Sequence, residues 1–119
     1  MSYRAIFWRP KSGIDPWLKV GSSTERLGEA LFRDVRAKKH SAVLENIPVE
    51  TIIAAVHQAF PETSTQKDGF SWDDNALGGF IVTWSPQHVS FCCFDLVGDD
   101  VLERIFAVME PFNLPHYDR

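Results

Sequence analysis

Cysteine is scarce in this 119-residue chain, which contains only Cys92 and Cys93, side by side. Neighbouring residues cannot easily form an ordinary disulfide, and in a strand their side chains point to opposite faces. We therefore interpret both as reduced thiols that fill space, which fits a reducing compartment.

Long apolar runs are also missing. No stretch approaches the roughly 20 apolar residues that a membrane-spanning helix needs. The N-terminus has neither the apolar core nor the small-residue cleavage site of a signal peptide. These absences predict a cytoplasmic protein with no membrane partner.

Motifs for metals, phosphates and covalent catalysis are not found either. The histidines show no His-x-x-x-His or Glu-x-x-His spacing, and there is no Cys-x-x-Cys. No glycine-rich loop of the phosphate-binding kind occurs. A Cys-His pair is disfavoured because His88 and Cys92 would lie roughly 13 Å apart along a strand. We predict no metal, no cofactor and no enzymatic activity. The alternative is a small enzyme built from dispersed residues: His57, His88, Cys92, Asp95 and His116.

Charge is unevenly distributed along the chain, whose net charge is −4. Residues 1–60 carry a balance of +3, whereas residues 61–119 carry −7. The net negative charge and the lack of a dense basic stripe disfavour nucleic-acid binding. An acidic half can attract a basic protein and raise its association rate. The alternative is that acidic turns and helix starts only keep the protein soluble.

The pattern of apolar residues predicts one α+β domain over residues 1–119. Strands are expected where aromatic and β-branched residues cluster. Helices are expected where apolar residues recur at helical spacing after a residue that favours a helix start, namely Ser22, Pro48 and Asp99. Strands are predicted at residues 3–8, 70–72, 80–84, 89–94 and 114–117. Helices are predicted at residues 23–38, 48–60 and 99–110. Loops are predicted at residues 9–21 and 61–69.

The predicted order is therefore β-α-α-β-β-β-α-β. Such an order favours three helices packed against a mostly antiparallel sheet. The strands at 80–84 and 89–94 should form an antiparallel hairpin through the Ser85-Pro86-Gln87-His88 turn. Both faces of this hairpin are apolar, so either the sheet is covered twice or one face is an interface.

Scattered residues along the chain resemble a loose family of small, uncharacterised bacterial cytoplasmic proteins. They are Met1-Ser2-Tyr3, Phe7-Trp8, Ile47-Pro48, Ala59-Phe60-Pro61, Trp72, Phe80 to Trp84 and Leu114-Pro115-His116-Tyr117-Asp118. The resemblance brings no catalytic motif with it. Small acidic domains of this kind are similar in general character to immunity proteins, which neutralise a partner toxin by binding it.

The leading hypothesis is thus a non-enzymatic binding protein, an immunity-type inhibitor of a basic toxin domain. Its expected partner-binding residues are acidic, with one aromatic anchor. They are Asp73, Asp74, Asp99, Asp100, Glu103 and Trp72. The alternative is a self-associating structural or regulatory module, in which an edge strand at 3–8 or 114–117 pairs across a two-fold axis to form a homodimer.

Overall fold

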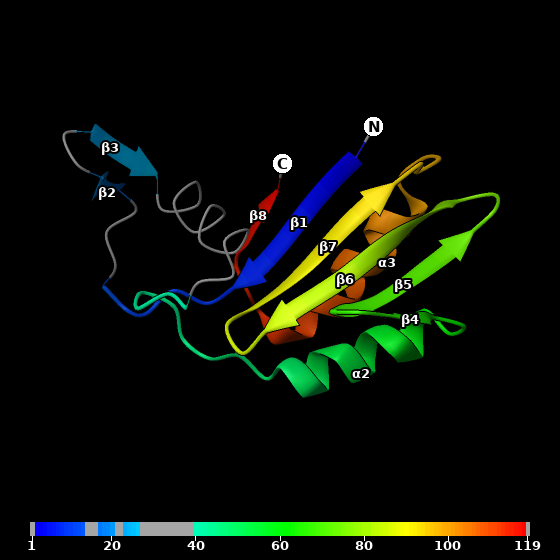
Figure 1. Cartoon of the computed structure of the whole chain (residues 1–119), viewed down its shortest axis with the longest axis horizontal. Coiled ribbons are helices and arrows are strands. Elements are labelled where there is room, and N and C mark those ends of the chain that lie inside the picture. Colours follow the sequence, from blue (N-terminus) through cyan, green and yellow to red (C-terminus); the bar gives the residue numbers. More distant parts are fainter. Residues whose placement is uncertain (1, 14–16, 21–22, 27–39, 119) are drawn as a thin grey trace.

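The computed structural model describes residues 2–13, 17–20, 23–26 and 40–118. Within these ranges an antiparallel six-stranded sheet of order β4-β5-β6-β7-β1-β8 forms one layer, and two α-helices form another (Figure 1). The predicted α+β class with a mostly antiparallel sheet is confirmed.

The central strands form where the sequence predicts them. The predicted hairpin is confirmed, because β6 and β7 pair from Gly79 with Phe94 to Ser85 with His88. The sheet strands are β1 Ser2–Trp8, β4 Ser64–Gln66, β5 Gly69–Asp74, β6 Gly78–Ser85, β7 His88–Phe94 and β8 His116–Asp118.

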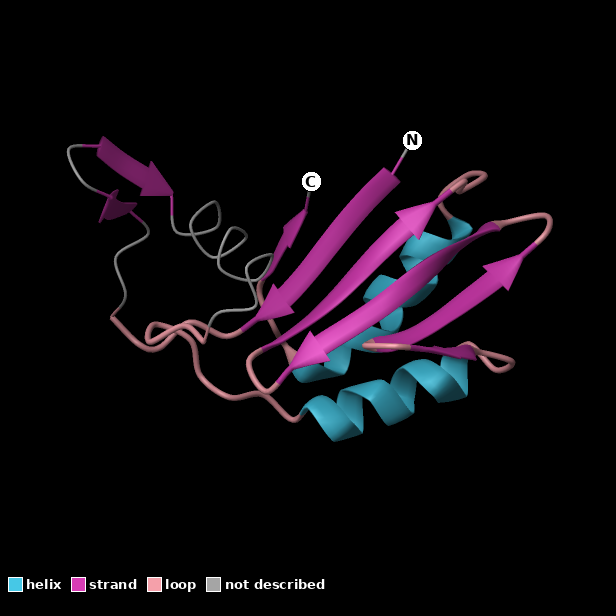
Figure 2. Cartoon of the chain, in the orientation of Figure 1, coloured by secondary structure: helices cyan, strands magenta, loops and turns pink. Residues whose placement is uncertain are grey.

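One face of the sheet forms the hydrophobic core with both helices. Ala5, Phe91, Val82 and Phe70 lie abreast on four neighbouring strands and are all buried. Alternate residues of a strand point to one face, so this row fixes the buried side. Helices α2 Val49–Ala59 and α3 Asp100–Met109 lie on that same side (Figure 2). Neither of the two described helices covers the other sheet face, which carries the exposed Ile81.

Arg104 of α3 ties the two helices together. Its guanidinium donates a 2.7 Å hydrogen bond to the carbonyl of Ala59, the last residue of α2, and lies 4.2 Å from the centre of the Phe60 ring. A cation favours a helix C-terminus because the last carbonyls carry partial negative charge.

Gln87 anchors the segment that precedes α2. Its buried side-chain oxygen accepts the N–H of Ser41 at 2.9 Å, and its amide nitrogen donates to the carbonyls of Ser41 and Leu44 at 2.7 and 3.1 Å. Buried backbone groups need such partners, since leaving one unpaired costs about 1–3 kcal/mol. The β6–β7 turn thereby holds the approach to α2 in place.

The prediction for residues 9–26 is wrong in two places. Strand β2 Trp17–Val20 lies in the predicted loop, and β3 Ser23–Arg26 replaces the start of the predicted helix 23–38. The two strands pair with each other, which satisfies backbone groups that the helix would have used. The prediction of a helix start rested on Ser22 with Glu25 three residues later, which matches a capping box. This pattern was misleading, and the Gly-Ser pair between the two runs of strand-forming residues was the hairpin signal. The rest of the predicted helix, 27–38, lies outside the described residues.

Corrections are also needed at the sheet edges and in the element order. β4 lies in the predicted loop 61–69; its residues are all exposed, so no apolar alternation marked it. The predicted edge strand near the C-terminus exists as β8, but β1 pairs with both β7 and β8 and is not an edge. The described order is β1, β2, β3, α2, β4, β5, β6, β7, α3, a 3-10 helix at Glu110–Phe112 and β8.

Candidate functional site

Two acidic connections meet at one end of the sheet. The N–H of Val97, in the β7–α3 loop, donates a 3.2 Å hydrogen bond to the carbonyl of Leu77, in the β5–β6 turn. Segments about twenty residues apart are thus held side by side. We call the surface they form the acidic tip. It comprises Asp73, Asp74, Asp95, Val97, Asp99 and Asp100.

Gly78 makes this close approach possible. Its φ is +99°, a conformation that residues with a side chain rarely adopt, and a Cβ there would lie only 2.7 Å from the carbonyl carbon of Asp95. Asp95 itself has a φ of 52°, which turns the chain out of β7. Aspartate is one of the few residues that tolerate this left-handed region.

The predicted acidic residues have different structural roles. Asp74 is half-buried, and its Oδ1 accepts the N–H groups of Ala76 and Leu77 at 2.8 and 3.0 Å, so it shapes the turn. Asp99 is the N-cap residue of α3 but makes no side-chain cap hydrogen bond. Asp73, Asp99 and Asp100 are exposed, and Glu103 lies exposed in the first turn of α3. The structure therefore brings the acidic residues to one end of the sheet, with Glu103 within the adjoining helix.

Val97 was missed in the sequence. It is 64% exposed in the β7–α3 loop and lies between Asp95 and Asp99 in the sequence. Single exposed apolar residues are common on protein surfaces, but Val97 is the most exposed large apolar side chain among the described residues. Nothing in the local sequence separates this valine from a buried one.

Trp72 lies in the core, away from the acidic tip's surface. It is only 8% exposed, and its ring centre lies 5.1 Å from that of Phe60 and 5.5 Å from that of Phe80. A ring in this position is not available to a partner. Its position two residues after Phe70, on the same strand face, was the signal of burial.

The residues of the alternative enzymatic site are separated. His57 stacks on Phe70 at 4.1 Å and shares a 3.0 Å hydrogen bond with Thr63, whereas His88 lies beside Ser85 at the β6–β7 turn. Asp95 lies at the acidic tip. Among the described residues, no three His, Cys, Asp or Glu side chains are grouped so that they could hold a metal ion.

The environments of the two cysteines differ. Burial, with a smaller contribution from Cys92, raises the pKa of the Cys93 thiol to about 12. Cys92 points to the opposite face and is half-buried. A thiol reacts as its thiolate, so Cys93 should be inert.

We expect one equivalent of a thiol reagent to label the folded protein at neutral pH and two equivalents to label the unfolded chain. Cys92→Ser should abolish labelling of the folded protein, whereas Cys93→Ser should leave it unchanged. Mass spectrometry of the intact protein measures both. Native labelling that persists in Cys92→Ser would contradict the assignment.

His88 is a neutral side chain at neutral pH. Burial lowers its pKa from 6.5 to about 4, and its Nδ1 lies 2.7 Å from the Oγ of Ser85. The folded state thus binds this proton less readily than the unfolded chain. The associated stability is present above pH 6.5 and is lost as the pH falls toward 4.

We expect the free energy of unfolding to decrease by about 2 kcal/mol more between pH 7 and pH 4 in the natural chain than in His88→Gln. This figure is below the full linkage value because the ring is partly exposed and water screens its charge. Urea unfolding at a series of pH values measures the difference, and the carboxylates cancel in the comparison. Parallel curves for the two proteins would rule out His88 as the cause.

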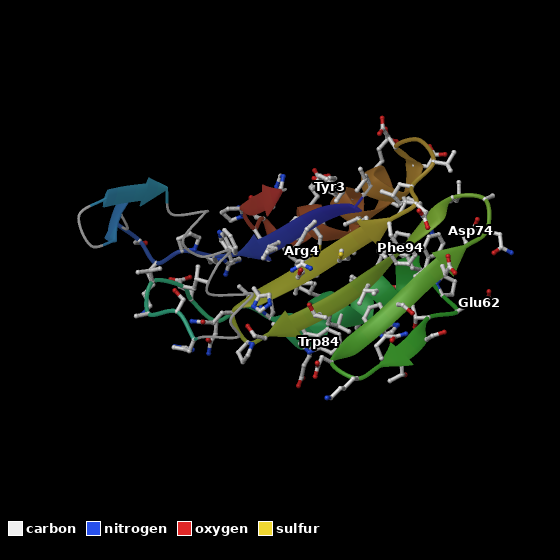
Figure 3. All side chains as sticks on the ribbon, turned by 45° about the horizontal axis from the view of Figure 1, so that its top comes forward. Tyr3, Arg4, Glu62, Asp74, Trp84 and Phe94 are labelled. Carbon is white, nitrogen blue, oxygen red and sulfur yellow. The ribbon has the colours of Figure 1, made fainter. Side chains whose placement is uncertain are left out.

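A groove lies at the other end of the sheet. It runs between residues 47–51, at the start of α2, and residues 84–86, where β6 ends, and has a volume of about 600 Å³. Figure 3 shows Trp84 and Asp74 at opposite ends of the β5–β6 hairpin. Trp84 lines the groove and is 38% exposed. The groove contains none of the histidines or cysteines named above.

No protein-family model, curated protein or solved structure matches the chain. In the part of the chain that the structure describes, no helix is long and apolar enough to cross a membrane.

Proposed function

We propose that the protein is a non-enzymatic binding domain of the immunity type, which neutralises a bacterial toxin by binding a basic surface of the toxin with its acidic tip. The observation that supports this proposal is the hydrogen bond between the β5–β6 turn and the β7–α3 loop, which brings acidic residues of both to one end of the sheet, where Val97 is 64% exposed. Charge and an apolar side chain are thus presented at the same end of the sheet.

Charged and apolar side chains of the tip have different effects on binding. Carboxylates at a surface mainly raise the association rate and select partners of opposite charge. A desolvated apolar side chain at the centre slows dissociation, because a few central contacts dominate interface energy. Asp73, Asp95, Asp99 and Asp100 supply the charge, and Val97 supplies the central contact.

The competing interpretation is that these aspartates only shape turns and start a helix. It accounts for Asp74, whose Oδ1 accepts two backbone N–H groups. It accounts less well for Asp99, which makes no side-chain cap hydrogen bond, and for the exposure of Val97. The tip therefore presents more charge and apolar surface than its turns require.

The proposal is tested by affinity capture with the tagged protein from its own host, with a Val97→Asp variant captured in parallel. We expect one stoichiometric partner with a basic domain to be retained by the natural chain and lost by the variant. Val97 is exposed, so the variant should fold. Equal recovery with both proteins would place the binding surface elsewhere, and recovery of the bait alone, from cells that produce the toxin, would reject the immunity function.

Self-association is the second candidate, and the sheet edges favour it. β4 and β8 are the outermost strands, and all three residues of β4 are exposed. An edge strand can pair with another copy of itself through free backbone groups. Both strands are short, however, which is one way in which proteins limit such pairing. Light scattering over a range of concentrations decides: a monomer at every concentration rejects this candidate.

A further inference from the structure

The groove beside α2 combines an aromatic surface with a single charge. Trp84 is held against Phe70, with the ring centres 5.8 Å apart and the planes inclined by 53°, yet 38% of the residue stays exposed. Phe70 on the neighbouring strand is buried. The indole of Trp84 therefore packs against Phe70 on one side, and its exposed part lines an open groove.

Glu50 supplies the charge. It also lines the groove, is exposed, and is the only carboxylate of α2. The N-terminus of a helix carries about half an elementary positive charge, which is less than the full negative charge of a carboxylate. Since Glu50 is the one ionised side chain among the described residues that line the groove, their net electrostatic preference is for a cation.

Half of the described lining is aliphatic and favours a ligand with a hydrocarbon part. Ile47 is buried, Val49 is half-buried, and Pro48 and Pro86 are exposed, whereas Thr51 and Ser85 add hydroxyl groups. A volume of about 600 Å³ can hold several side-chain-sized groups but does not enclose them. A flexible chain with a cationic head matches this combination better than a compact inorganic ion does.

We propose that this groove binds an arginine side chain from an extended segment of a partner protein. A guanidinium is planar, stacks on indole, and pairs with a carboxylate through its fork of N–H groups. The stem of the arginine and a neighbouring apolar residue cover Ile47 and Val49. A lysine ammonium is more strongly hydrated and stacks less well, so it binds more weakly. Because the groove and the acidic tip lie at opposite ends of the β5–β6 hairpin, the inference stands independently of the proposed function.

The test is a nuclear magnetic resonance titration of the whole protein with the peptide acetyl-Ala-Arg-Ala-amide. Its matched control is the same peptide with citrulline, which keeps the shape of arginine but has no charge. We expect millimolar affinity, with the indole N–H signal of Trp84 shifting, and at least threefold weaker binding of the citrulline peptide. The Trp84 signal is assigned as the one that is missing from Trp84→Leu.

Variants separate the two contributions. Glu50→Gln should weaken arginine-peptide binding about threefold, as expected for an exposed ion pair. Trp84→Leu should weaken it about tenfold, because the apolar surface is kept and the aromatic face is lost. Glu45→Gln, at an exposed acid that does not line the groove, should change nothing.

The inference is overturned if the citrulline peptide binds equally well, if Glu50→Gln behaves like Glu45→Gln, or if the shifts concentrate at the acidic tip. The last result would show nonspecific attraction to charge. Should Trp84→Leu fail to fold, the comparison of Glu50→Gln with Glu45→Gln still decides. The peptide titration requires no toxin. A negative result would therefore reject the arginine site and leave the proposed function of the acidic tip untouched.

Discussion

Reversing two charges at the acidic tip, with Asp99→Lys and Asp100→Lys together, is expected to slow association with a basic partner by about 10- to 100-fold. Both residues are exposed, and neither makes a side-chain hydrogen bond that caps α3. The fold should therefore survive, with a loss of about 1–2 kcal/mol from the unfavourable placement of positive charge at a helix N-terminus. Stopped-flow association kinetics with the captured partner measures the rate.

The control for this experiment carries the same change in net charge at other places. Glu45→Lys with Glu110→Lys alters two exposed acids outside the tip. If the tip is the binding surface, this control slows association much less than the tip variant does at moderate salt, because charges farther away than about 10 Å are screened. Equal slowing in both variants would indicate a general effect of net charge. A folded tip variant with unchanged rates would reject the tip as the site.

Replacing Gly78 by alanine is expected to lower the free energy of unfolding by about 4 kcal/mol, which combines left-handed backbone strain with overpacking. The φ of +99° disfavours any side chain, and the new Cβ would meet the backbone of Asp95 and Leu96, which cannot yield as a flexible side chain can. Chemical denaturation measures the loss. The contact between the two acidic turns should be lost as well, so partner binding falls with stability.

Gly98→Ala is the matched control, because it separates the strain of a positive φ from the steric clash of a new Cβ with neighbouring backbone atoms. Gly98 also has a positive φ, +74°, but a Cβ there would meet nothing within 4 Å. We expect this variant to lose only about 1 kcal/mol, the cost of the left-handed conformation alone. If the two variants lose equal stability, the packing of Gly78 against the β7–α3 loop is not what makes glycine necessary there.

The sequence predicts the parts of this fold whose apolar periodicity is strong. The buried Phe80 and Val82 of β6 fall at alternate positions, as do Val89, Phe91 and Cys93 of β7. In α3, Ile105 recurs four residues after Val101, at helical spacing. β4 carries only exposed polar residues, so its strand pairing leaves no apolar pattern. β2 and β3 were not predicted because residues 22–25 fit both a helix start and a hairpin. Local propensity alone does not decide between the two structures.

The candidate site could be predicted only in its composition. Charge asymmetry indicates the acidic half, but it does not show that Leu77 and Val97 meet, because that contact depends on the path of three strands. Trp72 is predicted as an aromatic anchor for a partner, but strand alternation places it with Phe70 in the core. The groove joins Glu50 to Trp84 across 34 positions of sequence and has no local signature.

The position of β1 in the sheet has a consequence for synthesis on the ribosome. This strand is made first, yet its hydrogen-bonding neighbours are β7 and β8, which begin at His88 and His116. At the usual 5–20 residues per second, roughly 4–16 s pass between the making of β1 and that of β7. During that interval Ala5, Ile6 and Phe7, all buried in the finished protein, have no sheet to join. The segment of β1 is thus exposed to chaperones and to aggregation for longer than the hairpin of β6 and β7, whose two strands follow each other directly in the chain.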